Sequence, residues 1–207
     1  MPQTALPSIA TSSISTEAAL PHVLVLASGK GARFRASGGG TPKLQALLEG
    51  KPVLQHTLDA VRASGLPWRL EDAGHPGMGD SIAAAVRATA SAAGWLVLPG
   101  DLPLIQPGSL RAVAAALLGC AVAVPVVAGQ RGHPVGFAAQ CLPDLLALHG
   151  DTGAAAVVRK FAAQGTLREV LLEDGGAVTD IDTLDDLERA AQLLRRDARA
   201  APVILLP

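Results

Sequence analysis

The sequence predicts an α/β fold with a mainly parallel sheet in a single domain. Short apolar runs rich in Val and Leu alternate with helical segments of about 11 to 14 residues, which is the pattern of repeated βαβ units. At 49% hydrophobic residues over 207 positions, the chain can also bury a full core. Sheets of this kind bind ligands beyond the carboxyl ends of their strands, so we expect function in the loops that follow the strands.

The first half of the body is predicted to hold two strands and a helix. Residues 22–27 (HVLVLA) form a short apolar run that stops at Gly-rich sequence, as a buried strand does. Residues 52–64 are predicted to be a helix, because Pro52 lies in the first turn and Gly65 follows the end. Residues 66–70 (LPWRL) are interpreted as a shortened strand.

The second half continues the alternation and ends in a charged helix. The expected elements are helices over 81–93 (closed by Gly94), 108–118, 153–164 and 183–196, and strands over 95–99 and 120–127. The last helix begins at a capping box, in which Thr183 is followed three residues later by Asp186. It ends on Arg195 and Arg196, whose positive charges suit the negative pole of a helix.

The two flanks differ from the domain, which we predict to span residues 21–197. Residues 1–20 are rich in Ser and Thr and lack the charged start of a signal peptide, so we expect a flexible N-terminal tail. Residues 198–207 (ARAAPVILLP) form an apolar C-terminal tail, which packs either on the domain or on a partner subunit.

Composition and charge exclude several classes of function. The net charge is −1, and two Trp, three Phe and no Tyr leave few stacking platforms, so a nucleic-acid partner is not expected. No apolar run reaches the roughly 18 residues of a membrane-spanning helix, so no membrane partner is expected either. The two cysteines, Cys120 and Cys141, suit a reduced, cytoplasmic protein without a structural disulfide.

The loop after the first strand, LASGKGARF, fails two generic nucleotide motifs. A dinucleotide fingerprint beginning at Gly29 and Gly31 requires glycine where Phe34 stands. A P-loop requires Ser or Thr directly after the Gly-Lys pair, where Gly31 stands. The function of the loop is therefore interpreted from the chemistry of its own residues, without either motif.

That chemistry is a glycine-rich backbone with cations close to it. The cations are Lys30, Arg33, Arg35 and, in a second segment, Lys43. Backbone N–H groups with Lys and Arg around them form an anion cradle. An ordinary solvated loop is an equally good interpretation of these residues alone.

The loop after the second strand, LPGDLPLI, places Asp101 just beyond the end of an apolar run. A carboxylate beside a phosphate cradle is a natural Mg²⁺ ligand, whereas the plainer alternative is a turn aspartate that accepts hydrogen bonds from nearby backbone. Asp182, just before the last helix, offers a second metal ligand. Its alternative role is to complement the dipole of that helix.

Five segments together resemble the MobA-like nucleotidyltransferase family, and within it the molybdenum cofactor cytidylyltransferase branch. They are LASGKGARF with the later PKL, GMGDSI, LPGDLPLI, RGHPVGF, and GDTGAAAV followed by DIDTLDDL. They occur in the family's order over residues 23–190. The resemblance implies a three-layer α/β/α, Rossmann-like nucleotidyltransferase fold and an enzyme.

The resemblance also implies roles for individual residues. Catalytic roles fall to Arg33, Lys43 and Asp101, and Asp101 and Asp182 are implied to bind Mg²⁺. The nucleotide-binding residues implied are Leu26, Ala27, Ser28, Gly29, Gly31, Gly77, Gly79 and Ser81. The acceptor side is implied to comprise Arg131, Gly132, His133, Pro134, Gly150, Asp151, Thr152 and Gly153.

The reaction implied by the resemblance transfers CMP from CTP to the phosphate of molybdopterin, the organic part of molybdenum cofactor, with release of pyrophosphate. A phosphate acceptor is already ionised near neutral pH, so the reaction needs no general base. His133 would then bind or orient the acceptor; its alternative is a solvated loop histidine. A molybdoenzyme is a candidate protein partner.

One departure from the family pattern keeps alternatives open. The opening motif ends in Ala-Gly in cytidylyl enzymes and in Gly-Gly in guanylyl enzymes, whereas Ser28 precedes Gly29 here. Guanylyl transfer, or nucleotidyl transfer to a sugar phosphate or polyol phosphate, is the second hypothesis. A non-catalytic protein that binds and delivers molybdenum cofactor is the third, and a lysine paired with a metal ligand argues against it.

Overall fold

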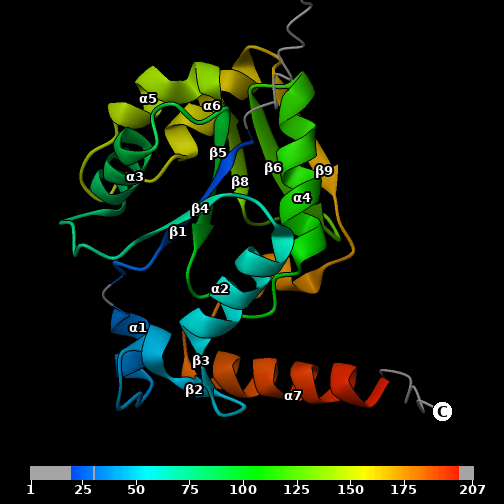
Figure 1. Ribbon diagram of the computed structural model, residues 1–207. Coiled ribbons are helices and arrows are strands. Elements are labelled where there is room, and N and C mark those ends of the chain that lie inside the picture. The colour runs from blue at the N-terminus through cyan, green and yellow to red at the C-terminus, as the bar shows by residue number, and fades with distance from the viewer. Residues whose placement is uncertain (1–19, 30, 201–207) are drawn as a thin grey trace, which may run out of the picture.

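The computed structural model describes residues 20–29 and 31–200, with side chains described as far as Arg196 (Figure 1). Its helices are α1 (Ala32–Ala36), α2 (Val53–Ser64), α3 (Met78–Ala88), α4 (Pro107–Ala116), α5 (Leu142–Leu146), α6 (Ala155–Ala163) and α7 (Leu184–Ala200). Its strands are β1 (His22–Leu26), β2 (Leu47–Leu48), β3 (Lys51–Pro52), β4 (Trp68–Glu71), β5 (Gly94–Pro99), β6 (Val122–Val127), β7 (Gln130–Arg131), β8 (Val135–Ala138) and β9 (Leu167–Leu171).

Seven strands form the main sheet in the order β4-β1-β5-β8-β6-β7, with β9 paired to β6. The pairs β1–β4, β1–β5 and β6–β9 are parallel, and β8 runs antiparallel between β5 and β6. The predicted α/β class is confirmed, and residues 66–70 do contribute a strand, β4, beside β1. The antiparallel β8 was not predicted, because VGFA is short and contains a glycine.

Alternate residues of each central strand face opposite layers of helix. In β1, Leu24 packs with α3, α5 and α6, whereas Val23 and Val25 pack with α2 and α4. This period-two burial on both faces is the reason the strands are continuous apolar runs. The result is three layers, with α2 and α4 on one face of the sheet and α3, α5 and α6 on the other (Figure 1).

A third apolar cluster lies beside the main sheet. It joins α1, the short β2–β3 hairpin and α7 through Phe34, Leu48, Ile181 and Ala190, all of them buried. Figure 1 shows these elements together below the sheet. The cluster holds the residues around Lys43 and Asp182 against the ends of the strands.

Helix boundaries follow their local chemistry, with some shifts from expectation. Helix α3, expected over residues 81–93, begins at Met78 and ends at Ala88. Gly94, expected to close this helix, is instead the first residue of β5. The expected capping box of α7 is present, because the Asp186 carboxylate accepts from the Thr183 N–H at 2.9 Å and the Thr183 hydroxyl oxygen accepts from the Asp186 N–H at 3.2 Å. The Thr183 hydroxyl also donates to the Asp186 carboxylate at 2.7 Å. Burial alone would raise the pKa of Asp186, but these hydrogen bonds outweigh it and lower the pKa.

The predicted tails lie largely outside the described residues. Residues 1–19 and 201–207 are outside them, as is Lys30, one of the four cations of the expected cradle. Along the part of the chain that is described, no helix has the length and apolarity to cross a bilayer.

The carboxyl ends of β1, β4 and β5 lie at one edge of the sheet, since Leu26 is in register with both Glu71 and Pro99. The loops that follow β1 and β5 therefore meet there. The Gly100 N–H bonds to the Leu26 carbonyl at 2.9 Å, and a Cβ at position 100 would lie 3.1 Å from that oxygen. Glycine is needed here because the two loops approach so closely.

Hydrogen bonds and close packing join the start of α3 to the loop 149–152. The Gly79 N–H donates to the Gly150 carbonyl at 2.8 Å, and the Asp80 carboxylate accepts from the Gly150 N–H at 3.0 Å. A Cβ on Gly77 would lie 2.1 Å from the Gly150 carbonyl, and one on Gly79 would lie 2.7 Å from the Thr152 carbonyl. These two glycines therefore serve packing between two segments of the sequence.

Helix α4 is capped by a carboxylate from a distant segment. Its own N-cap residue, Gln106, makes no side-chain cap. Buried Asp174 accepts instead from the Gln106 N–H at 2.8 Å and the Ser109 hydroxyl at 2.7 Å, and also from the Gly176 N–H at 2.9 Å. One side chain thus ties α4 to the segment that leads to Asp182.

Replacing Asp174 with alanine should lower the free energy of unfolding by about 2–4 kcal/mol, because three donors lose a charged acceptor. Asp144→Ala is the matched control: its ion pair with Lys160 is exposed, so the loss should stay under about 1 kcal/mol. Urea unfolding measures both variants. Equal losses would contradict the role given to Asp174.

Replacing Gly79 with alanine should cost about 1–3 kcal/mol of stability, since the added methyl group must push the 149–152 backbone away. Gly108, in the first turn of α4, has open space at its Cβ position. Gly108→Ala should therefore stabilise by about 0.5–1 kcal/mol. Thermal unfolding followed by circular dichroism compares them, and a neutral Gly79→Ala would refute the tight packing.

Candidate active site

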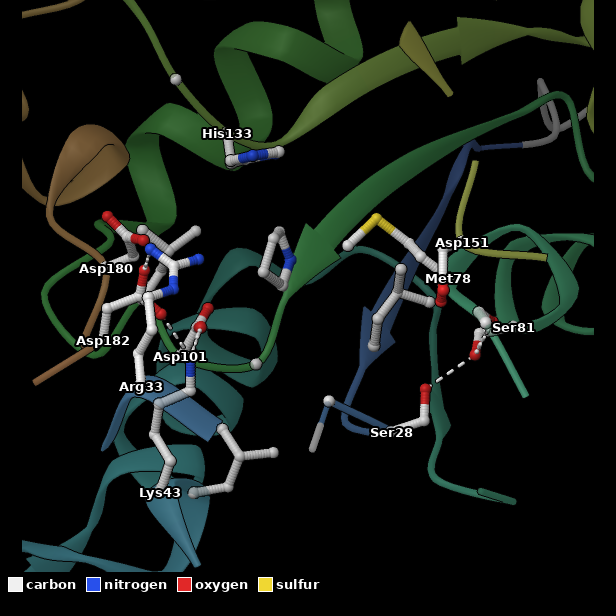
Figure 2. Close-up of a pocket in the computed structure, with 18 of the residues that line it drawn as sticks. Ser28, Arg33, Lys43, Met78, Ser81, Asp101, His133, Asp151, Asp180 and Asp182 are labelled. Carbon is white, nitrogen blue, oxygen red and sulfur yellow. Dashed lines mark hydrogen bonds and ion pairs between the residues drawn. The ribbon is translucent and has the colours of Figure 1, made fainter. Parts of the chain in front are cut away.

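A cavity of about 640 Å³ opens at the carboxyl ends of β1 and β5 (Figure 2). Its volume lies in the range of small-molecule sites. The expected site residues that line it are Leu26, Ser28, Gly29, Arg33, Lys43, Gly77, Ser81, Asp101, Arg131, Gly132, His133, Asp151 and Asp182. The cavity therefore brings together expected residues from segments spread across the chain.

Lys43 forms ion pairs with two carboxylates at one end of the cavity. Its Nζ donates to Asp101 Oδ2 at 2.6 Å and to Asp182 Oδ1 at 3.0 Å, although these partners are 58 and 139 residues away in sequence. All three side chains are largely buried, with exposed fractions of 13%, 15% and 21%. The Asp101 carbonyl also accepts from the Ile181 N–H at 3.0 Å, which places Asp182 beside Asp101.

The electrostatics of this cluster favour a charged lysine. Burial alone would lower the pKa of Lys43, but Asp101 and Asp182 outweigh it and raise the pKa above its usual value. Asp101 Oδ1 is buried with no hydrogen-bond partner. The two carboxylates thus already converge on a cation and keep one oxygen unused.

The donor set fits a divalent metal held jointly with a ligand. Mg²⁺ typically takes one or two carboxylates together with substrate phosphates. Within the described residues, no cluster of three or more acidic, histidine or cysteine side chains is arranged to hold a metal alone. Asp101 and Asp182 would therefore need phosphate oxygens to complete the coordination.

Arg33, on α1, extends the charged end of the cavity toward solvent. Its guanidinium pairs with Asp182 Oδ2 at 2.5 Å, but its side chain is 79% exposed. An exposed pair of this kind contributes about 0–1 kcal/mol, so little holds Arg33 in place. The guanidinium of Arg33 can therefore turn from Asp182 to a bound anion at little cost in free energy.

His133 lies in the cavity wall near Asp101. Its backbone N–H donates to the Ala177 carbonyl at 2.8 Å, and its Nδ1 is buried without a partner. Burial lowers its pKa, and the nearby Asp101 only partly offsets this. His133 is thus a half-buried imidazole whose Nδ1 is shielded from solvent and whose pKa is lowered.

The other end of the cavity is lined mostly by uncharged groups, with the Asp151 carboxylate beside them. In Figure 2, Ser28, Met78 and Ser81 lie on the far side from Lys43 and Asp182. The Ser28 and Ser81 hydroxyls are 2.7 Å apart, and the Ser81 hydroxyl donates to the Gly77 carbonyl at 3.1 Å. The cavity therefore joins an end of clustered cations and carboxylates to an end of hydroxyls, glycines, a thioether and the carboxylate of Asp151.

Seven expected site residues are not among those that line the cavity. They are Ala27, Gly31, Gly79, Pro134, Gly150, Thr152 and Gly153. Gly31 has a φ of 56°, and a Cβ there would lie 3.4 Å from the Lys43 Cβ, so it allows the first loop to approach Lys43. Gly79 and Thr152 belong to the packing between α3 and the loop 149–152. Their local role in the structure is to support residues that do line the cavity.

Several lining residues were not expected from the sequence. They are Leu44, His75, Pro76, Met78, Pro99, Gly100, Leu102, Gln130, Ala177, Val178 and Asp180. Most are neighbours of expected residues and could have been included by position. His75 is different, since the sequence around it gave no signal beyond its proximity to GMGDS.

Comparisons with known proteins agree with this architecture. The MobA-like NTP transferase domain matches residues 60–167. The chain is 32% identical over 197 residues to a molybdenum cofactor guanylyltransferase from Cereibacter sphaeroides, which covers 84% of this chain and 97% of that protein. It is also 32% identical over 115 residues to the bifunctional protein GlmU of Desulfitobacterium hafniense (strain DSM 10664 / DCB-2), which covers 44% of this chain. The matched region spans only 25% of the length of that GlmU.

A solved structure gives the same answer for the fold. The crystal structure of a homologue of Mycobacterium tuberculosis Rv0371c, from Mycobacterium sp. strain JC1, superposes with a TM-score of 0.69 at 26% identity. The superposition covers 84% of this chain and 96% of that one. The expectation of a transferase enzyme is confirmed at the level of the family. The chain belongs to the MobA-like NTP transferase family.

Proposed function

We propose that this protein is a Mg²⁺-dependent enzyme that transfers CMP from CTP to the phosphate of molybdopterin in molybdenum cofactor and releases pyrophosphate. The observation that carries the proposal is the pairing of Lys43 with both Asp101 and Asp182 at one end of a cavity of nucleotide size. The likeness to a molybdenum cofactor guanylyltransferase over most of both chains supports molybdenum cofactor as acceptor.

Asp101 and Asp182 are the residues proposed to hold the metal. When bound, a divalent ion supplies charge stabilisation for the triphosphate at the point of transfer. Lys43 would then exchange its carboxylate partners for phosphate oxygens, which is possible because its amine already lies between the two acidic groups. Arg33, weakly held at the rim, would add a second cation to the phosphates.

The remaining residues would position the two substrates. Catalysis of this kind depends mainly on positioning and charge stabilisation. A phosphate acceptor attacks without losing a proton, so no general base is required. His133, half-buried and with an unpaired Nδ1, would bind or orient the acceptor, together with Arg131 and Asp151 at the same cavity.

Guanylyl transfer to the same acceptor is the second candidate, and the guanylyltransferase relative favours it. Against it, a Gly-Gly pair typical of guanylyl enzymes is absent, because Ser28 precedes Gly29. Nucleotidyl transfer to a sugar phosphate or polyol phosphate is a further enzymatic alternative within the same family. A protein that only binds the cofactor would release no pyrophosphate.

The direct test is pyrophosphate release from CTP, GTP, UTP and ATP, each offered with Mg²⁺ and molybdopterin, molybdenum cofactor or a sugar phosphate. The proposal expects release with CTP together with a molybdopterin-containing acceptor. Preference for GTP would establish the second candidate. Release only with the sugar phosphate, or none with any pair, would contradict the proposal.

Asp101→Asn should reduce turnover by at least about 100-fold, because the amide removes the negative charge that holds the cation. Asp59→Asn is the matched control. The exposed carboxylate of Asp59, on α2, pairs with Lys51 of β3 and Arg62 of α2, and it does not line the cavity. Both variants should remain folded by circular dichroism. Retained turnover in folded Asp101→Asn would refute the metal assignment.

A further inference from the structure

The two ends of the cavity suit different parts of a nucleotide. The end with Arg33, Lys43 and Asp101 carries the charges that a triphosphate and its metal require. The opposite end, around Ser28 and Ser81, is left for the nucleoside. No Phe, Tyr or Trp is among the residues that line the described cavity, so recognition there rests on hydrogen bonds.

The hydroxyl protons of the serines at the nucleoside end are already committed. Ser28 and Ser81 bond to each other at 2.7 Å, and Ser81 also donates to the Gly77 carbonyl at 3.1 Å. A hydroxyl has a single proton to donate. His75, which lines the cavity beside Gly77, is a side chain at this end that retains an unused ring nitrogen.

His75 is oriented by a buried carboxylate. Glu71, at the end of β4, is only 4% exposed and lies with its Oε1 3.0 Å from His75 Nε2. The Ala73 N–H donates to the same oxygen at 3.4 Å, and Arg69 Nε lies 3.8 Å from the other oxygen. Surrounded by donors, Glu71 acts as an acceptor, so the Nε2 of His75 must carry the proton that they share.

This hydrogen bond fixes the polarity of the other ring nitrogen. In a neutral imidazole one nitrogen donates and the other accepts. In the neutral form of His75, with that proton on Nε2, Nδ1 is a pure acceptor. We propose that Glu71 holds His75 in this tautomer, and that Nδ1 selects a nucleobase with an amino donor over one with a carbonyl at the same position.

The proposal rests on the proposed function and concerns which of the two pyrimidines the site prefers. Cytosine presents an amino donor at the position where uracil presents a carbonyl acceptor. A fixed acceptor therefore bonds to cytosine and repels uracil. Glu71 is a positioning residue, and His75 is the specificity residue.

The test compares CTP with UTP, which share the ribose and the triphosphate. Binding to the full chain is measured by isothermal titration calorimetry with Mg²⁺ at pH 8. The wild type should bind CTP about tenfold more tightly than UTP, the scale of one well-placed hydrogen bond. Titration of 2′-deoxy-CTP into the wild type and into His75→Phe tests the ribose: an affinity loss relative to CTP that occurs only in the wild type would assign His75 to the ribose and overturn the proposal.

Three variants separate recognition from orientation. His75→Phe keeps a ring without Nδ1, and His75→Gln keeps a donor to Glu71 without an acceptor at the Nδ1 position. Both should reduce the CTP preference to about threefold or less. Glu71→Gln should also reduce it, because a carboxamide no longer fixes the tautomer. Thermal unfolding without ligand confirms that each variant is folded.

The outcomes distinguish this inference from the function beneath it. If the wild type binds no nucleoside triphosphate, the proposed function fails and the inference with it. If CTP and UTP bind equally, or the folded His75 variants keep the full preference, the inference alone is overturned. A wild-type preference that both His75 variants and Glu71→Gln lose supports it.

Discussion

The site depends on one constraint: the amine of Lys43 needs two carboxylates around it to remain charged in a largely buried position. Asp101 reaches it from the end of β5, and Asp182 reaches it from the segment before α7. The backbone bond from Ile181 to Asp101 keeps those two segments together. Three parts of the chain that are remote in sequence are thereby fixed at one point, which is also the point where a metal and a triphosphate would be bound.

The walls of the cavity are positioned by packing that leaves little room for adjustment. Gly77 and Gly79 admit the backbone of residues 149–152 at distances that a side chain would prevent, and Asp174 ties α4 to the segment leading to Asp182. These contacts involve no ligand. They make the geometry of the site a property of the fold, which suits catalysis by positioning.

Much of the fold and site could be predicted because apolar runs, glycines and prolines mark them locally. The strands at 22–27 and 95–99 and the joints after them were visible in the sequence, and the resemblance to a family related their residues to one another. The antiparallel β8 was missed because its four residues are too few for a periodic signal. His75 was missed because its importance comes from Glu71 and the cavity, contacts that depend on β4 lying beside β1. The structure also gives several expected nucleotide-binding glycines a packing role that no local pattern could reveal.

The central claim is that the Lys43–Asp101–Asp182 end of the cavity binds a metal–nucleotide complex. The most direct test is the unfolding temperature of the full chain with CTP, with and without Mg²⁺. Ligand at about 100 times its Kd stabilises a protein by about 2.7 kcal/mol, so CTP with Mg²⁺ should raise the unfolding temperature clearly, and by much more than CTP alone. The absence of any Mg²⁺-dependent rise, with CTP or with GTP in its place, would contradict the account.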